Sequence, residues 1–156
     1  IKQGKGRPIA IYEINHNLQA NNLAILSACL LDEVLKRLDD TNRKDLLNSL
    51  AQGVLGNSGS IRQSRNLTQR INDSINQLNN LNYYARWEAR ASGPRIIFGN
   101  CPYTEIIKDH PELCEMDQEI LQSLLTCEVE QIAQIDQKPK DSPVCIFRLS
   151  LSKKMP

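Results

Sequence analysis

The sequence predicts an α+β fold, in which an N-terminal helical arm is followed by an antiparallel sheet of about four strands packed with helices. Three observations lead to this prediction. Apolar residues recur at helical spacing over residues 17–80. Short runs of alternating apolar and polar residues replace this pattern after Asn82. Turn-forming residues separate these runs, first around Ser92–Pro94 and again over 137–143.

The length and charge of the chain narrow the classes of protein to which it can belong. Its 156 residues suffice for one domain with an extra helical arm, or for two small modules, with a core that forms without disulfides. The net charge of +1 gives no strongly basic surface for nucleic acid. Without a long apolar run or a signal-peptide pattern, we expect a cytoplasmic protein that makes no membrane contact. The chain begins with Ile1, and we expect further protein to precede it.

The first part of the chain is expected to form a strand and a long helix. Alternating isoleucines within residues 1–14 predict a short strand after a turn at Gly4–Pro8. The segment 17–39 is predicted to be an amphipathic helix. Its apolar positions follow steps of three and four residues: Leu23, Leu26, Leu30, Leu31, Val34, Leu35 and Leu38. Such a face packs either against a second copy or against the core of its own domain, and the pattern alone does not decide between them.

Two further helices are predicted before the sheet. The first covers 43–55, where Thr41 or Asn42 is the candidate cap and Gly56 follows the last turn. The second covers 66–80, again with apolar residues three and four positions apart. The stretch between them contains glycine and serine and predicts a loop or hinge.

The C-terminal half is predicted to combine strands with helices. A hairpin surrounds the turn at Ser92–Pro94. Two helices follow, over 102–109 and 111–125, and each begins with a proline. The last two strands are expected over 127–136 and 143–151, on either side of a turn.

Five cysteines occur in the chain, and four of them lie in its last third: Cys101, Cys114, Cys127 and Cys145. An odd number of cysteines in a cytoplasmic protein argues against a disulfide framework and for metal or redox chemistry. Their spacing is neither that of a zinc finger or ribbon nor that of a ferredoxin. The fifth, Cys29, falls within an apolar helical run, so we expect it to be a core residue.

The surroundings of the other four cysteines favour a shared site. Cys101 stands beside Pro102, and Cys114 lies in the first turn after Pro111. Both prolines are expected to begin helices, where free N–H groups and the helix dipole lower a thiol pKa. Cys145 lies on the last predicted strand. We therefore predict that Cys101, Cys114 and Cys145 hold a metal or cluster together. Cys127 is the less well placed ligand, because a helix of about twelve residues separates it from Cys114 by about 20 Å. The alternative for all four is that small thiols fill the core.

Other polar residues give weaker signals. His110, four residues before Cys114, is the candidate non-cysteine ligand, and its alternatives are a helix cap and a solvated loop residue. The chain contains no catalytic serine triad pattern, phosphate-binding loop, dinucleotide-binding motif or HExxH zinc motif. With only two histidines, we predict that the protein is not an enzyme.

Two segments resemble parts of known regulators. GRPIAIYEI at 6–14 resembles the end of the wing in winged-helix proteins of the ArsR, MarR and DeoR types. NCPYTEIIKDHPELC at 100–114, with CIFRL at 145–149, is similar to the C-terminal domain of SufR-like iron–sulfur repressors. The resemblance implies a DNA-binding winged helix upstream, a homodimer, and a [4Fe–4S] or related cluster held by the four cysteines. In that family the cluster tunes repression of iron–sulfur assembly genes.

The resemblance divides the chain into three parts: the end of a wing over 1–14, a helical dimerisation and linker segment over 15–60, and a cysteine-containing sensor domain over 61–156. An iron–sulfur cluster is the leading cofactor hypothesis, and zinc is the alternative. The gap of 17 residues between Cys127 and Cys145 is longer than the family's pattern, which leaves Cys127 open as the fourth ligand. Exposed clusters oxidise in air, so an aerobic sample can lack the cluster.

Two hypotheses of other classes stay open. The domain could bind a small apolar molecule between its helices and the hairpin, with its cysteines in the core or on a structural zinc ion. It could also be a plain dimerisation domain that senses nothing. Under the leading hypothesis, gain or loss of the metal changes how the segment 101–125 is seated. That change would alter the spacing of two DNA-reading heads.

Overall fold

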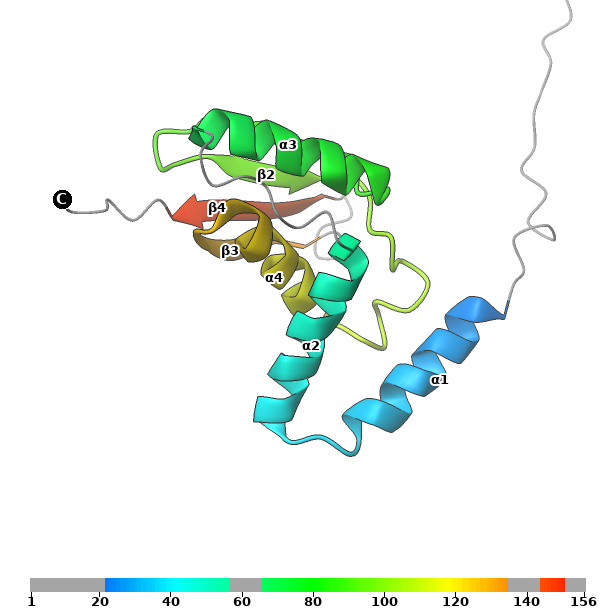
Figure 1. Cartoon of the computed structure of the whole chain (residues 1–156). Helices are drawn as coiled ribbons and strands as arrows, with labels where there is room; N and C mark the ends of the chain where they lie inside the picture. The colour runs from blue at the N-terminus through cyan, green and yellow to red at the C-terminus, as the bar shows by residue number, and fades with distance from the viewer. Residues whose placement is uncertain (1–21, 57–65, 135–143, 151–156) are drawn as a thin grey trace, which may run out of the picture.

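The computed structural model describes residues 22–56, 66–134 and 144–150, and these ranges form an α+β structure (Figure 1). In chain order the elements are α1 (Leu23–Leu35), α2 (Asp40–Leu55), α3 (Leu67–Asn80), β1 (Ala85–Glu88), β2 (Arg95–Phe98), α4 (Leu113–Leu125), β3 (Glu128–Ala133) and β4 (Cys145–Ser150). The strands form one antiparallel sheet in the order β1-β2-β4-β3. Helices α3 and α4 pack on this sheet, and α2 packs against α4. The predicted fold class is confirmed, whereas the wing-like segment 1–14 and most of the predicted hinge lie outside the described residues.

Helix α1 is shorter than predicted and extends away from the sheet and its helices (Figure 1). It ends at Leu35, and residues 17–21 of the predicted helix lie outside the described ranges. None of its residues is buried, and Cys29 is exposed. The prediction that Cys29 is a core residue is therefore wrong. Its apolar surroundings in the sequence belong to a helix that has almost no core of its own chain to face.

Helix α2 begins three residues earlier than predicted. The carboxylate of Asp39 accepts a hydrogen bond from the backbone N–H of Asn42 at 2.8 Å, so Asp39 is the N-cap in place of Thr41 or Asn42. Gly56 follows the helix, as predicted, with a φ of 60° that glycine adopts without strain. The inner face of α2 buries three residues against α4: Leu47, Ala51 and Leu55.

Helix α3 and the following hairpin agree with the predictions. The side chain of Asn66 accepts a hydrogen bond from the N–H of Gln69 at 2.9 Å and caps α3. The turn between β1 and β2 contains Gly93, whose φ is 105°. A Cβ atom at this position would lie 3.0 Å from the carbonyl oxygen of Leu149, so both conformation and space require glycine.

The segment between β2 and α4 differs from its prediction. The sequence predicts a helix over 102–109, whereas the structure has consecutive turns there. Some backbone hydrogen bonds in these turns join residues three positions apart, and others join residues four positions apart. The N–H groups of Ile106 and Ile107, for example, both donate to the carbonyl oxygen of Tyr103 at 2.9 Å. A short segment between two prolines does not sustain a regular helix, because nucleation is costly and the residue before a proline disfavours the helical conformation. Cys114 therefore lies at the start of a regular helix, and Cys101 does not.

The two faces of the sheet differ in character. Val129, Cys145, Phe147 and Leu149 are buried on the face that α3 and α4 cover. The residues between them point to the other face, where Glu130 and Arg148 lie opposite each other and form an ion pair. One face that packs on the core and one that carries charged side chains are common in antiparallel sheets. This alternation directs Cys145 toward the helices.

Candidate thiol site

Three of the four predicted cysteines converge at one end of the sheet. Cys145 begins β4 and lies opposite Phe98, the last residue of β2. Cys101 follows Phe98 by three positions, so β2 carries it to the same end. Cys114 is the second residue of α4, which packs on the same core. The thiol of Cys114 interacts electrostatically with those of Cys145 and Cys101, which places the three side chains in one region.

The surroundings of Cys114 favour the protonated thiol. Burial, followed by the charges of Asp117, Cys145 and Cys101, raises the pKa of Cys114 to about 12. The lowered pKa that the helix start predicts is therefore wrong for this residue, because loss of hydration outweighs the helix dipole. Without a bound metal, the thiol of Cys114 is protonated at neutral pH.

An amide group on β3 opposes this effect. The side chain of Gln131 acts on the sulfur of Cys114 in the direction that lowers its pKa. The Oε1 atom of Gln131 accepts from Gln134 at 3.3 Å, whereas its buried Nε2 has no well-aligned hydrogen-bond partner within the described part of the chain. The amide N–H group thus lies near the sulfur without a regular bond. An N–H donor in this position stabilises a metal-bound thiolate.

Asp117 is a site residue that the sequence reasoning missed. It lies one turn after Cys114 on α4, it is 4% exposed, and its carboxylate accepts a hydrogen bond from the hydroxyl of Tyr83 at 2.6 Å. Burial raises the pKa of Asp117 to about 7, and the hydrogen bond from Tyr83 limits the rise. The signal in the sequence was a carboxylate among the apolar positions of the predicted helix.

The structure does not bring Cys127 to the other three cysteines. This residue follows the C-terminal end of α4, and the 13 residues of that helix span about 20 Å. Burial raises the pKa of Cys127, and the charged groups that act on it are Arg70 and Glu128. The convergent set is therefore Cys101, Cys114 and Cys145.

His110, the candidate non-cysteine ligand, is buried and faces two carboxylates. Its Nδ1 atom lies 2.9 Å from Oε1 of Glu112, and its Nε2 atom lies 4.0 Å from Oδ1 of Asp32 on α1. The side chain is only 2% exposed, so it is not a solvated loop residue. These contacts give His110 a role in joining α1 to the start of α4.

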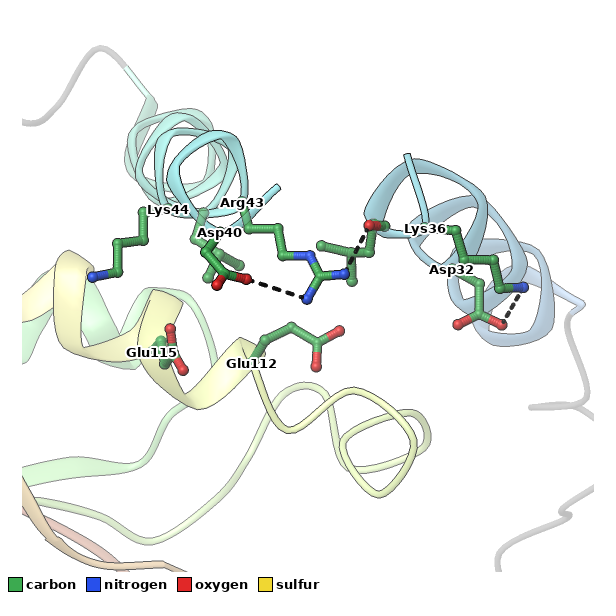
Figure 2. Close-up of a pocket in the computed structure, with 9 residues that line it drawn as sticks. Asp32, Lys36, Asp40, Arg43, Lys44, Glu112 and Glu115 are labelled. Carbon is green, nitrogen blue, oxygen red and sulfur yellow. Dashed lines mark hydrogen bonds and ion pairs between the residues drawn. The ribbon is translucent and has the colours of Figure 1, made fainter. Parts of the chain in front are cut away.

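Asp32 and Glu112, the two carboxylates that His110 faces, also line a charged cavity of about 550 Å³ (Figure 2). It lies between α1, α2 and the start of α4, and its labelled side chains are Asp32, Lys36, Asp40, Arg43, Lys44, Glu112 and Glu115. Arg43 donates to the carbonyl oxygen of Leu35 at 3.2 Å and lies 3.9 Å from the carboxylate of Asp40. Four acidic and three basic side chains line the cavity, so it does not select strongly for an ion of either sign.

A second hollow between α1 and α2 is almost entirely apolar, and we call it the α1–α2 groove. Its volume is about 430 Å³. It is lined by Ser27, Leu30, Leu31 and Val34 of α1, by Leu46, Leu50 and Val54 of α2, by Tyr103 and Ile106, and by Leu113 and Met116 of α4. The last two residues flank Cys114, so the groove and the thiol site share the first turn of α4.

The side chains as they stand do not form a finished metal site. Across residues 22–56, 66–134 and 144–150, no three His, Cys, Asp or Glu side chains are close enough together to hold a metal ion. Ligation by the three convergent cysteines would require their side chains to turn toward one another.

Comparison with protein-family models, with curated proteins and with solved structures found no match. The resemblance to winged-helix and SufR-like regulators therefore stays a prediction. Among the helices that the structure describes, none is long and apolar enough to cross a membrane.

Proposed function

We propose that this chain is the sensing and dimerisation domain of a cytoplasmic transcription regulator, and that Cys101, Cys114 and Cys145 bind an iron–sulfur cluster or another metal. DNA would be bound by a winged helix upstream, of which residues 1–14 form the end. The observation that carries the proposal is that Cys101, Cys114 and Cys145 come from three separate parts of the chain to one end of the sheet, where the charges of Cys101 and Cys145 act on the thiol of Cys114.

The donor set fits three-thiolate ligation better than four. Cys127 is separated from the other three by the length of α4, so the fourth position of a tetrahedral metal, or the fourth iron of a cluster, would be left to another ligand. The amide of Gln131 supports the proposal, because its buried Nε2 would find an acceptor in a metal-bound sulfur. When bound, the metal or cluster would supply charge compensation for the Cys114 thiolate, because burial otherwise keeps this thiol protonated.

Proton release follows from the pKa of Cys114. A thiol with a pKa of about 12 must lose its proton before it binds a metal. The folded chain therefore takes up metal more tightly as the pH rises, and acid favours release. Asp117 and the thiol site share α4, so the carboxylate is close enough to contribute to this pH dependence.

The route from the site to DNA would run through the first turn of α4. Cys114 lies there between Leu113 and Met116, which line the α1–α2 groove. Turning the thiols toward a metal would shift this turn and the segment that begins at Cys101. Helix α1 contacts the same region through Asp32 and His110, and it lies directly after the N-terminal segment. A change in the seating of α1 would alter the spacing of two DNA-binding heads.

The test is metal analysis of protein purified without oxygen. We expect iron and sulfide, or zinc, at a fixed ratio to protein, with broad visible absorption if a cluster is bound. Cys114→Ser should abolish the metal, and Cys127→Ser is the matched control that should retain it. Absence of iron and zinc from anaerobic wild-type protein would contradict the proposal, as would equal loss in both variants.

A second candidate function is binding of a small apolar molecule, and the α1–α2 groove is the observation that favours it. In that case Cys101, Cys114 and Cys145 would be core residues or ligands of a structural zinc ion. Cys114→Ser would then leave ligand binding in the groove intact. A series of apolar probes, titrated against wild-type and Cys114→Ser protein, separates this candidate from the first.

A further inference from the structure

Helix α1 has two apolar stripes, of which one is half-buried and the other is exposed. The inner stripe is half-buried and consists of Ala24, Ala28, Leu31 and Leu35. The outer stripe consists of Leu23, Leu26, Leu30 and Val34, which are 63%, 53%, 58% and 42% exposed. At about 100° per residue the two stripes are offset by about a third of a turn. A helix with a single partner needs only one apolar stripe, so the outer one indicates a second contact.

The two halves of the outer stripe have different surroundings. Leu30 and Val34 form one wall of the α1–α2 groove, whereas Leu26 lies beyond its end toward the N-terminus of α1. Figure 1 shows α1 and α2 diverging as the two arms of a V. The groove lies between these arms. It is closed at its base by Leu113 and Met116 of α4 and is open to an apolar element from outside.

We propose that the α1–α2 groove binds helix α1 of a second copy of this chain, which presents the outer stripe as its contact face. The inference rests on the proposed function in one respect, which is that the domain is a dimer. A second copy is favoured over other occupants because the contact is reciprocal. Each chain supplies one exposed stripe and one groove, and a two-fold axis covers all four surfaces at once.

Size agrees with this occupant. The groove volume of about 430 Å³ equals that of roughly fourteen water molecules at about 30 Å³ each. Three or four leucine side chains, with four carbon atoms each, contain a similar number of heavy atoms. The 13 residues of α1 extend about 20 Å, and a helix of this length is marginal in water without a packing partner.

Charge selects an antiparallel arrangement of the two α1 helices. The charged residues of α1 and its C-terminal turn lie together at one end: Asp32, Glu33, Lys36 and Arg37. The first half of the helix, from Leu23 to Leu30, contains none. Antiparallel packing places this uncharged half against the partner's charged half and avoids pairs of like charges.

This arrangement connects the dimer to the thiol site. The groove base includes residues on both sides of Cys114, and its lining includes Tyr103, whose hydroxyl interacts electrostatically with Cys101. A metal that turns the thiols would therefore act on the surface that receives the partner helix. The dimer itself does not require the metal.

Light scattering after size-exclusion chromatography tests the inference on the full chain. Wild-type protein should have about twice the 17.7 kDa mass of one chain. Leu26→Glu, on the inserted half of the stripe, and Leu30→Glu, on the groove wall, should each raise the dimer dissociation constant by roughly 100-fold or more, since each places two charges in an apolar interface. Ile132→Glu is the matched control, because Ile132 is exposed on β3 at an edge of the sheet, and it should remain dimeric. Circular dichroism should show native helix content in all three variants.

Three results would overturn the inference: a monomeric wild-type protein at all concentrations, dimeric Leu26→Glu and Leu30→Glu variants, or dissociation by Ile132→Glu. The last would place the interface at the edge of the sheet. Metal analysis of monomeric Leu26→Glu separates this inference from the proposed function. If the monomeric variant binds metal, the proposal of a thiol metal site stands without the dimer. If wild-type protein is a dimer that contains no metal, the metal proposal is wrong and the proposed dimer contact in the α1–α2 groove is supported.

Discussion

The hydroxyl group of Tyr83 donates a hydrogen bond to the carboxylate of Asp117 at 2.6 Å, and both side chains are buried. Tyr83 lies between α3 and β1, and Asp117 lies on α4, so this bond joins two elements of the core. Burial raises the pKa of both groups. The pair is therefore neutral between about pH 4 and pH 7, where an exposed aspartate is ionised, and it tolerates burial in this range for that reason.

Asp117→Asn is expected to remove a pH dependence of stability. The pKa of Asp117 is about 7 in the folded chain, against 3.8 for an ordinary aspartate. Between these values the folded state binds one more proton than the unfolded state, so stability falls as the pH rises through this window. A pKa difference of about three units between the folded and unfolded states corresponds to about 4 kcal/mol in the free energy of unfolding. Urea unfolding between about pH 4 and pH 8 should show a flat profile for this site in the variant, and higher stability than wild type above pH 7. The exposed Asp45→Asn should keep the wild-type slope, and an Asp117→Asn variant that keeps it would refute the assignment.

Tyr83→Phe should destabilise the chain by about 1–3 kcal/mol, because the buried carboxyl group of Asp117 loses its donor. Without that hydrogen bond the pKa of Asp117 rises further, so the decline in stability extends to higher pH. The comparison variant is Tyr103→Phe, whose hydroxyl lies 3.4 Å from that of Tyr83 and makes the weaker contact. If urea unfolding shows the same loss of stability in both variants, the effect comes from packing and not from the carboxyl group of Asp117.

Asn79→Ala should loosen the edge strand β1. The side chain of Asn79 accepts from the backbone N–H of Ala85 and donates to its carbonyl oxygen at 3.1 Å, which joins the end of α3 to the start of the strand. Removing both contacts should cost about 1–2 kcal/mol and speed hydrogen exchange at Ala85. Asn80→Ala, at the last residue of α3, is the control with the same change of side chain and should leave exchange at Ala85 unaltered.

The parts of the fold that the sequence predicts well are those whose pattern is local. Helix α3 has its apolar spacing and its Asn66 cap within a few residues, and it appears within one residue of its predicted bounds. The last strand, predicted over 143–151, is likewise present as β4 over Cys145–Ser150. In these cases neighbouring residues decide the conformation, so one sequence is sufficient.

The predictions that fail depend on what lies across the fold. The apolar stripe of α1 indicates a helix but does not name its partner, and so Cys29 was assigned to a core that its own chain does not provide. The pKa of Cys114 follows from burial under elements distant in sequence, which a helix-start argument does not include. Asp117 was missed because its partner, Tyr83, stands 34 positions away.

The five thiols should differ in reactivity according to how exposed each one is and how its surroundings shift its pKa. Cys29 is exposed on α1, whereas Cys145 is buried and burial raises the pKa of Cys114 to about 12. Because the thiolate is the reactive form, a thiol with this pKa has roughly one ten-thousandth of its molecules ionised at pH 8. A disulfide reagent should therefore react fastest at Cys29, in a phase that Cys29→Ser removes, and Cys114 should react slower than Cys29 by about 1000-fold. All five should react rapidly in urea. A fast phase that survives in Cys29→Ser but disappears in Cys114→Ser would show that the thiol site is open to solvent, and the raised pKa of Cys114 would then be wrong.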